Sequence, residues 1–399
     1  MYETIAVLAA ILLGYCVFAG RIERSTLSGP ILFTAVGYFL GLRLTDVLHV
    51  DVTSTALRSL AEMTLAMVLF SDAASADFSI IRRHVGVPVR LLLIGLPLTI
   101  LLGLLIAWPL FPSLGVLELG LLATILAPTD AALGAPVVAN KAVPAVVRES
   151  LNLESGLNDG ICVPIVVILL GYAVGVRIEH GTLTHATLVV AEEFGIGLLV
   201  GLGLTVCAGW VFGFAKRAEW LSEDWWEVPA LALAACCFAT AQALGGSGFI
   251  ACFASGLLVS PLTWPRKHDW LRGSETVGRI LAALTWILFG AAVVTRLPTW
   301  THIPSLIYAV LSLTVIRMVP VFLCLRGSEI STQGKLFMGW FGPRGLASIV
   351  FAIIAFDARL PGNQVLMGTI AWTILLSVVL HGVTANPWIQ RFAAATGRP

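Results

Sequence analysis

The sequence predicts an all-α polytopic membrane protein of about thirteen transmembrane helices, each long enough to cross the hydrocarbon core. Of the 399 residues, 58% are hydrophobic and only 12% are charged, and the mean hydropathy is +0.93. Apolar runs recur along the whole chain, and charged residues lie mostly between them. No water-soluble core can bury so much apolar surface, so the composition excludes a soluble enzyme, a nucleic-acid-binding protein and a disordered chain.

The predicted helices follow one another with short connections that contain charged residues, proline or glycine. They lie near residues 4–20, 29–45, 56–74, 88–110, 116–139, 145–176, 186–215, 227–245, 248–262, 276–296, 302–325, 333–356 and 364–390. The run at 248–262 is short for a crossing. The first run is not expected to be a cleaved signal, because no basic residue precedes it and Arg21 and Arg24 follow it.

The basic residues alternate between the loops on the two sides, which predicts an outside N-terminus and a cytoplasmic C-terminus. Seventeen of the 24 Lys and Arg residues fall in the loops assigned to the cytoplasm, including the pairs Arg82–Arg83 and Lys216–Arg217. The outer loops hold only Arg43, Arg58, Arg177, Arg296 and Arg359. Residues 392–399 are expected to form a short cytoplasmic tail after the last span.

Six of the charged residues within the predicted spans are singled out, because a charge at mid-membrane depth costs about 2.5–3.5 kcal/mol on insertion scales and usually marks a transport pathway. They are Asp72, Asp130, Glu154, Asp159, Arg317 and Arg344. The seven cysteines lie mostly in apolar runs and show no metal-binding spacing. No resident cofactor is therefore expected.

The predicted helix at 145–176 carries the most informative polar face, in the motif L-E-S-G-L-N-D-G. Glu154 and Asn158 are four residues apart, as are Ser155 and Asp159, so they form two adjacent rows on one side of a helix. Two carboxylates, a hydroxyl and an amide offer oxygen ligands that suit a hard cation. The alternative is a polar seam that joins two helices, although such a seam rarely needs two acids.

Two predicted helices contain sequences that interrupt an α-helix near mid-membrane. They are A-P-T-D-A-A-L-G-A-P around Asp130 in span five and G-P-R-G around Arg344 in span twelve. Such breaks leave backbone groups unpaired, and we expect Asp130 to neutralise N–H ends and Arg344 to neutralise C=O ends. Pro128 and Pro343 are 215 residues apart, which predicts two inverted six-helix repeats, spans one to six and eight to thirteen. A simple packing kink is the alternative for either break alone.

These motifs resemble those of the monovalent cation:proton antiporter family, the NhaP and NHE-type sodium/proton exchangers. The resemblance rests on A-P-T-D in span five, E-S-G-L-N-D-G in span six and G-P-R-G-L-A-S in span twelve, with a weaker match in L-F-S-D-A-A-S-A-D at the end of span three. It implies a homodimer with the NhaA-like antiporter fold, in which two discontinuous helices cross. It also implies a dimerisation or scaffold domain of residues 1–85 and 177–300, and an ion-transporting core domain of residues 86–176 and 301–391.

The same resemblance implies roles for the polar residues of spans five and six. Asp159 matches the carboxylate that binds the ion or the proton. Ser155 and Thr129 match the oxygen ligands beside it, and Asn158 matches the amide that marks the electroneutral branch of the family.

The remaining charges are expected to support this site. Glu154 is either a further cation ligand or an acid held by an arginine, for which Arg317 is a better candidate than Arg344. Asp130 and Arg344 match the charges that stabilise the helix crossing. Asp72 stands where many relatives carry a glutamate, and it has a shorter side chain to reach the site.

The expected function is secondary antiport in the plasma (inner) membrane, and not enzymatic catalysis. Its expected physiological role is pH homeostasis. Asp159 would bind either a proton or a dehydrated Na⁺ (or Li⁺), never both, and an empty anionic site would resist crossing the apolar barrier. Asn158 supplies an oxygen without a second titrating charge, so the exchange is expected to be one-for-one and electroneutral.

Three other functions are considered. A K⁺/H⁺ antiporter of the same family is the nearest, because ion choice depends on small differences in ligand spacing. An organic-anion symporter of similar fold would need basic or neutral residues in place of Glu154 and Asp159. An intramembrane aspartyl protease could pair Asp130 with Asp159, but the G-x-G-D motif of such enzymes is absent.

Overall fold

The computed structural model describes residues 2–22, 28–43, 55–76, 86–138, 140–178, 183–260 and 267–395. Within these ranges every regular element is a helix and there is no strand. The predicted loop residues Arg24, Arg82 and Arg83, the last aspartate of the span-three motif (Asp77) and residues 396–399 of the tail lie outside the described ranges.

Seven of the described helices are long and apolar enough to cross a membrane, judged by length and composition. They are Tyr2–Ile22, Gly86–Leu110, Ala145–Val174, Ala191–Arg217, Asp269–Trp300, Ile303–Cys324 and Asn363–Phe392. Five shorter apolar helices lie at Gly29–Leu42, Val116–Ile125, Val228–Ala243, Gly248–Val259 and Leu346–Asp357. The chain is a helical membrane protein, as its composition predicts.

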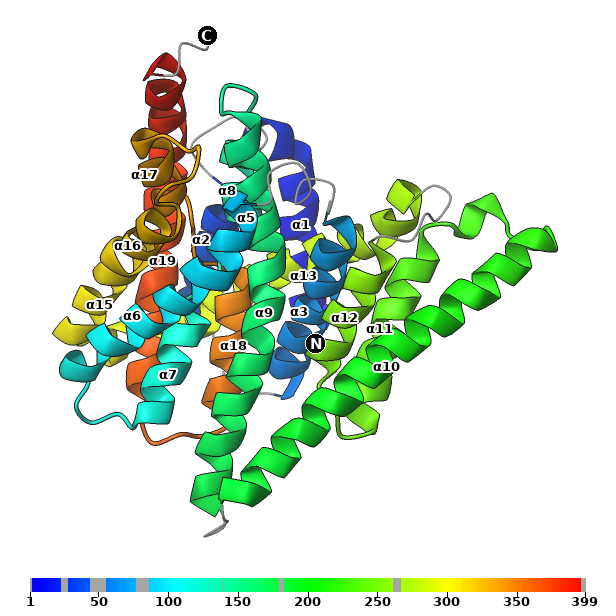
Figure 1. The fold of residues 1–399 in the computed structure, drawn as a ribbon, viewed down its shortest axis with the longest axis horizontal. Helices are drawn as coiled ribbons and strands as arrows, with labels where there is room; N and C mark the ends of the chain where they lie inside the picture. Colours follow the sequence, from blue (N-terminus) through cyan, green and yellow to red (C-terminus); the bar gives the residue numbers. More distant parts are fainter. Residues whose placement is uncertain are drawn as a thin grey trace.

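The helices follow the chain in the order shown in Figure 1. The first part forms α1 (Tyr2–Ile22), α2 (Gly29–Arg43), α3 (Thr55–Ser75), α5 (Gly86–Arg90), the π-helical segment η1 (Leu91–Gly95), α6 (Leu96–Leu110), α7 (Val116–Ile125), α8 (Ala131–Val138) and α9 (Ala145–Ile178). The second part forms α10 (Leu183–Arg217), η2 (Glu223–Trp225), α11 (Val228–Ala243), α12 (Gly248–Val259), α13 (Lys267–Ala292), η3 (Val294–Arg296), α14 (Leu297–Trp300), α15 (Ile303–Leu313), α16 (Val315–Cys324), α17 (Thr332–Trp340), α18 (Leu346–Asp357) and α19 (Asn363–Ala395).

Three predicted helices differ from the observed ones. The predicted helix at 276–296 begins at Lys267, because its first turns carry charged residues that a search for apolar runs leaves out. The predicted helix at 302–325 is divided at Thr314, whose φ of −111° and ψ of −91° lie outside the helical region. The predicted helix at 88–110 contains the π-helical segment η1 between α5 and α6.

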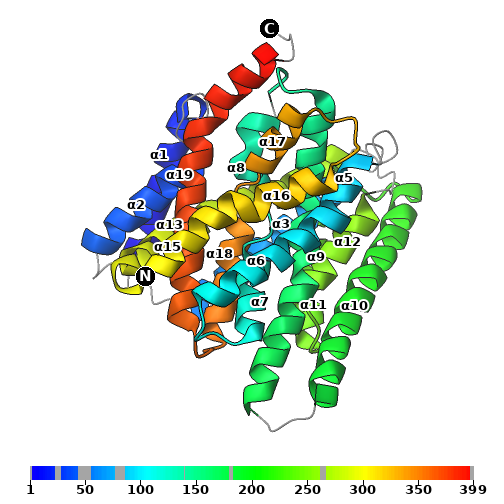
Figure 2. The same ribbon diagram turned by 60° about the vertical axis from the view of Figure 1, so that its left-hand side comes forward.

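Both predicted interruptions are present. Residues 126–130 separate α7 from α8, and residues 341–345 separate α17 from α18. The two unwound segments touch, because the N–H of Asp130 donates a hydrogen bond of 2.8 Å to the carbonyl of Pro343. In Figures 1 and 2, α8 and α17 lie toward the end of the molecule that carries the C-terminus, and α7 and α18 lie toward the opposite end. The two interrupted helices therefore run in opposite directions.

Two groups of helices pack on either side of this contact. In one group α3 packs against α11, α12 and α13, and α13 also packs against α2. In the other, α9 contacts α7 and α8, while α19 contacts α15 and α18. Helix α3 also touches α9 and α18, so it joins the two groups near the unwound segments (Figure 1).

Candidate functional site

Asp130 lies where the two interrupted helices meet, and its carboxylate is bonded to both of them. Oδ1 accepts a hydrogen bond of 2.9 Å from the N–H of Leu133, in the first turn of α8. Oδ2 accepts one of 2.7 Å from the N–H of Leu346, where α18 begins. A carboxylate at a helix N-terminus offsets its unpaired N–H groups and the positive end of its dipole. Gly345 is required here, because a Cβ at this position would overlap the Asp130 carboxylate.

Arg344 faces carbonyl groups instead, and its side chain is fully buried. Its Nη1 donates to the carbonyls of Ala127 at 2.7 Å and Pro128 at 3.1 Å, just after the last turn of α7. The hydroxyl of Ser348 donates to the carbonyl of Ile125 at 2.7 Å. These contacts satisfy carbonyl groups that a helix leaves unpaired at its C-terminus. The crossing thus places a carboxylate against N–H groups and a cation against C=O groups.

Thr129, in the same unwound segment as Asp130, connects the crossing to α9. Its Oγ1 accepts a hydrogen bond of 2.7 Å from Nδ2 of Asn158 and lies 3.0 Å from Oγ of Ser155. All three side chains are buried. The Oδ1 of Asn158 is buried and has no hydrogen-bond partner in the part of the chain that the structure describes.

Asp159 follows Asn158 on α9 and is only 6% exposed. Its Oδ1 is also buried and without a hydrogen-bond partner among the described residues. Asp159 shares a helix face with Ser155, four residues earlier. Two oxygen atoms without donors among the described residues therefore occur on adjacent residues. Asn158 is bonded to Thr129, and Asp159 lies about one helical turn after Ser155.

The helices of the first group cover this face of α9. Gly160 allows the ring of Phe253, on α12, to pack closely, because a Cβ at position 160 would overlap that ring. Gly156 lies against Asp72, near the end of α3. Asp72 is partly exposed, whereas Asp159 is buried. The structure thus brings Asp72 to within about one helical turn of Asp159 along α9.

Glu154 pairs with Arg317, on α16, and not with Arg344. Nη1 and Nη2 of the arginine donate to the two carboxylate oxygens at 2.6 and 2.8 Å, and each side chain is 1% exposed. A buried pair of this kind is costly to break from one side, because the remaining charge is left without a partner. Gly342, in the second unwound segment, lies against the same guanidinium.

These contacts divide the buried acidic residues into two kinds. Asp130 and Glu154 already have both carboxylate oxygens bonded to donors. Asp159 has a buried oxygen without a donor, an arrangement that is expensive unless a proton or a cation binds there. In the described part of the chain no three His, Cys, Asp or Glu side chains gather as in a metal centre. Asp159 is therefore the buried carboxylate with an acceptor left for a proton or a monovalent cation.

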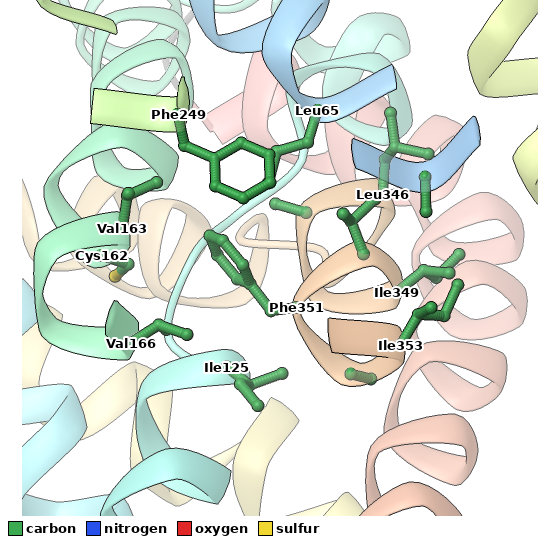
Figure 3. Close-up of a cluster of buried hydrophobic side chains, with 14 of the residues drawn as sticks. Leu65, Ile125, Cys162, Val163, Val166, Phe249, Leu346, Ile349, Phe351 and Ile353 are labelled. Atoms are coloured by element: carbon green, nitrogen blue, oxygen red, sulfur yellow. The ribbon is translucent and has the colours of Figure 1, made fainter. Parts of the chain in front are cut away.

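Apolar side chains close one side of this site. Figure 3 shows Phe351 of α18 beside Val163 and Val166 of α9, with Phe249 of α12 and Leu65 of α3 nearby. The two valines lie about one and two turns beyond Asp159 along α9. The site is therefore separated by an apolar layer from the end of the molecule at which α3 begins.

Three further residues, which the sequence does not mark as part of the site, contact the crossing. They are Ser348, which bonds to the end of α7, and Ser377 and His381 of α19, which contact the second unwound segment. The only signal for the last two is a serine and a histidine four residues apart in an otherwise apolar helix. The partners of such a pair depend on which helix lies opposite, and a single sequence does not contain that information.

The sequence profile of a family described as "Sodium/hydrogen exchanger, transmembrane" matches residues 7–391. The chain is 26% identical over 373 residues to the K(+)/H(+) antiporter NhaP2 of Shewanella sp. (strain ANA-3), covering 90% of this chain and 62% of that protein. It is 26% identical over 338 residues to the K(+)/H(+) antiporter NhaP of Alkalimonas amylolytica, covering 83% and 57%. The chain thus spans about three fifths of the length of these relatives.

Among solved structures, the chain resembles the sodium proton antiporter MjNhaP1 from Methanocaldococcus jannaschii. The TM-score is 0.77, the sequence identity is 20%, and the match covers 98% of each chain. At this level of identity the likeness establishes a shared fold. The all-helical fold around the two unwound segments is that of this antiporter structure.

Proposed function

The chain belongs to the sodium/hydrogen exchanger family, and from that premise we propose that it exchanges a monovalent cation for protons across a membrane. The observation that carries this proposal is the pair of unpartnered buried oxygens, Oδ1 of Asp159 and Oδ1 of Asn158. The hydroxyl of Thr129 is bonded to Asn158 and lies within hydrogen-bonding distance of the hydroxyl of Ser155, which precedes Asp159 by about one turn of α9. Asp159 takes either the cation or the proton, so that each excludes the other.

Competition for a single carboxylate is sufficient to couple the two fluxes. With a proton or a cation bound, Asp159 is neutral, and it can move past the apolar layer at low cost. The empty carboxylate would take a charge into that layer, at a cost of about 2.5–3.5 kcal/mol or more. The two loaded forms therefore change sides while the empty form does not. Ser155, Thr129 and Asn158 replace part of the water shell that the cation leaves behind.

The transported cation is Na⁺ (or Li⁺) in our first proposal and K⁺ in the second. The motifs of spans five, six and twelve support the first, since they resemble sodium/proton exchangers. The names of the two curated relatives support the second, since both are K⁺/H⁺ antiporters. The set of ligand types is compatible with either ion, so the choice is left to measurement.

The exchange is proposed to be one-for-one and electroneutral. Asn158 contributes an oxygen and no charge, and Glu154 and Asp130 are held by donors within the protein. Asp159 is then the carboxylate whose charge changes between the two loaded forms. We assign Glu154 to the ion pair with Arg317, and not to the cation, because both of its oxygens already accept hydrogen bonds.

The wider architecture is proposed on the same premise. Residues 1–85 and 177–300 form the dimerisation domain, and residues 86–176 and 301–391 form the mobile core. Two inverted six-helix repeats, a homodimer, a plasma-membrane location and an outside N-terminus complete the proposal. The opposite directions of the two interrupted helices and the packing of α3 against α12 and α13 support the repeats and the domain division.

A peptidase that pairs Asp130 with Asp159 is disfavoured by the contacts of Asp130. Catalysis by two aspartates requires both carboxyl groups to be available for proton exchange at the reacting bond. In this protein each oxygen of Asp130 accepts a backbone N–H, and the family consists of transporters.

The proposed function is tested by proton flux in proteoliposomes that contain a pH-sensitive dye. Na⁺, Li⁺ and K⁺ are titrated separately, with and without an imposed membrane potential. We expect saturable, cation-driven proton flux that does not respond to the potential, and we expect Asp159→Asn to abolish it. Asp269→Asn, which changes an exposed acid at the start of α13, is the matched control and should retain flux.

Two results would overturn parts of this proposal. Full cation-driven flux in the Asp159→Asn variant would remove Asp159 from its role. A strong response to membrane potential would contradict one-for-one exchange and the role given to Asn158. The cation that drives proton flux at the lowest half-maximal concentration is taken as the transported ion.

A further inference from the structure

The break between α17 and α18 removes one particular backbone hydrogen bond, and two side chains of α19 occupy its place. In an uninterrupted helix the N–H of Arg344 would donate to the carbonyl of Trp340, four residues earlier. Here the N–H of Arg344 donates to Oγ of Ser377 at 2.7 Å. The carbonyl of Trp340 lies 2.8 Å from Nε2 of His381 and also accepts the N–H of Gly342 at 2.8 Å.

Ser377 and His381 contact each other as well as the break. They are four residues apart on one face of α19, and their exposed fractions are 0% and 2%. Oγ of Ser377 lies 3.2 Å from Nδ1 of His381. Both side chains are thus buried between the two backbone groups that the break has separated.

The directions of these hydrogen bonds follow from the atoms involved. A carbonyl oxygen only accepts, so Nε2 of His381 carries a hydrogen and donates it to Trp340. Nδ1 lies 2.8 Å from the backbone carbonyl of Ser377 and 3.2 Å from its hydroxyl oxygen, so it contacts both polar groups of that residue. The hydroxyl oxygen of Ser377 accepts the N–H of Arg344. The two side chains thus contact each other, and each also holds one of the two backbone groups that the break has separated.

The surroundings of His381 are aromatic. Its ring centroid lies 5.2 Å from that of Trp340 and 6.4 Å from that of Phe341. Trp340 stacks on Trp388 at 5.6 Å, and its Nε1 donates to Thr384 at 2.9 Å. These rings limit the space in which water could take the place of a missing side-chain partner.

We propose that Ser377 and His381 are positioning residues for the ion site, a role that rests on the proposed function. They replace the missing backbone hydrogen bond and so fix the place of Arg344 along the interrupted helix. The guanidinium of Arg344 in turn holds the carbonyls of Ala127 and Pro128. The next residue is Thr129, whose hydroxyl bonds to Asn158. A displacement of Arg344 is therefore transmitted to the ligands without any contact between α19 and the ion.

The first test compares variants that remove one link each. Ser377→Ala and His381→Phe remove a hydrogen-bonding group and keep most of the volume. Loss of one such bond is expected to raise the half-maximal cation concentration about fivefold, the equivalent of about 1 kcal/mol. The double variant is expected to raise the half-maximal concentration no more than the more damaging single variant does, since both side chains replace the same missing backbone hydrogen bond.

Conservative variants and a matched control separate positioning from packing. Ser377→Thr keeps the hydroxyl and His381→Gln keeps an N–H donor, so both should stay within about twofold of the wild-type half-maximal concentration. Thr373→Val removes a buried hydroxyl one turn earlier on the same helix; among the described residues its Oγ1 bonds only to the carbonyl of Thr369. This control should leave the half-maximal concentration unchanged.

The second readout is cation binding by the purified protein, measured as the ion-dependent rise in Tm. The same shift in half-maximal concentration is expected here. If Ser377→Ala and His381→Phe lower Tm but leave the half-maximal concentration at the wild-type value in both assays, the role is structural only and the proposal is wrong. Absence of proton flux in the wild type would contradict the proposed function, while the binding assay would still decide the role of Ser377 and His381.

Discussion

Four carboxylates in the membrane-spanning part differ in what their oxygen atoms already contact. Both oxygens of Asp130 accept backbone N–H groups, and both oxygens of Glu154 accept donors of Arg317. Asp72 is partly exposed beside α9. Asp159 is buried with an unpartnered oxygen. At the scale of single residues, the unused acceptor distinguishes Asp159, the carboxylate proposed to exchange ions, more clearly than burial does.

The ion pair of Glu154 and Arg317 gives a prediction about folding. Arg317→Ala leaves a buried carboxylate without its partner, which costs about 3–5 kcal/mol. We therefore expect a large loss of monodisperse protein in detergent and a lower Tm. The double variant Glu154→Gln with Arg317→Met removes both charges and should recover much of the yield.

The same double variant decides the role of Glu154. If it folds and still exchanges cations, Glu154 acts through folding alone. If it folds at wild-type yield but no longer binds the cation, Glu154 is a ligand and the structural assignment is wrong.

At the scale of elements, the two interrupted helices depend on close backbone contact at Gly345. A Cβ at this position would overlap the carboxylate of Asp130, which caps both α8 and α18. We expect Gly345→Ala to push the two unwound segments apart and to abolish exchange, with a lower Tm. The measurement is proton flux per amount of folded protein.

Gly134→Ala is the matched control for this prediction. Gly134 lies in α8, close to the crossing in sequence, but a Cβ there would meet open space. Alanine also favours the helix by about 1 kcal/mol relative to glycine. This variant should exchange normally, and equal damage from both substitutions would contradict a specific contact at Gly345.

The sequence predicts the helices well and their contacts poorly, for a physical reason. Apolar runs reflect contact with lipid, and proline and glycine at 128 and 342–343 mark the two interruptions. The types of charge at Asp130 and Arg344 follow from the polarity of helix ends. Their partners do not, because the N–H of Leu346 is 216 residues away from Asp130.

Two features had no usable sequence signal. The predicted helix is divided at Thr314. Threonine also occurs inside helices, so nothing in the apolar run marks this division. The contacts of Ser377 and His381 with the second unwound segment could be predicted only by knowing which segment faces α19. Such contacts are long-range, and a single sequence does not specify them.

At the scale of the whole molecule, helices α3 and α18 meet along one side of the site. Asp72 of α3 lies near Asp159. The apolar layer that includes Leu65 and Phe351 follows toward the start of α3, and an ion pair lies beyond it, where α3 begins and α18 ends. That pair joins Arg58, at the start of α3, to Asp357, the last residue of α18. Apolar side chains and this ion pair thus lie between Asp159 and this end of the molecule. Under the proposed domain division, the pair links the scaffold to the mobile core.

This ion pair gives a prediction about alternating access. The Arg58 side chain is 45% exposed, so the pair contributes about 0.2–1 kcal/mol. Its loss changes the population ratio of two conformational states by at most about fivefold. We expect Arg58→Gln and Asp357→Asn each to favour the state that is open toward Arg58. The measurement is the half-maximal cation concentration on each face of oriented proteoliposomes. The ratio of the two concentrations should change by up to about fivefold.

A double variant provides the control for this prediction. If the two substitutions act through the same pair, the Arg58→Gln and Asp357→Asn double variant should behave like either single variant. Additive effects would mean that the residues act separately. No change of the ratio in any of the three variants would contradict a role for the pair in the equilibrium between states.

The most direct test of the central claim counts the protons released when the purified protein binds a cation in weakly buffered detergent solution. Linkage between cation binding and one titrating carboxylate predicts release that approaches about one proton per bound cation at pH values where the empty site is protonated. The Asp159→Asn variant should release none. Cation binding by the wild type without proton release, or undiminished release in the variant, would contradict competition between cation and proton for Asp159.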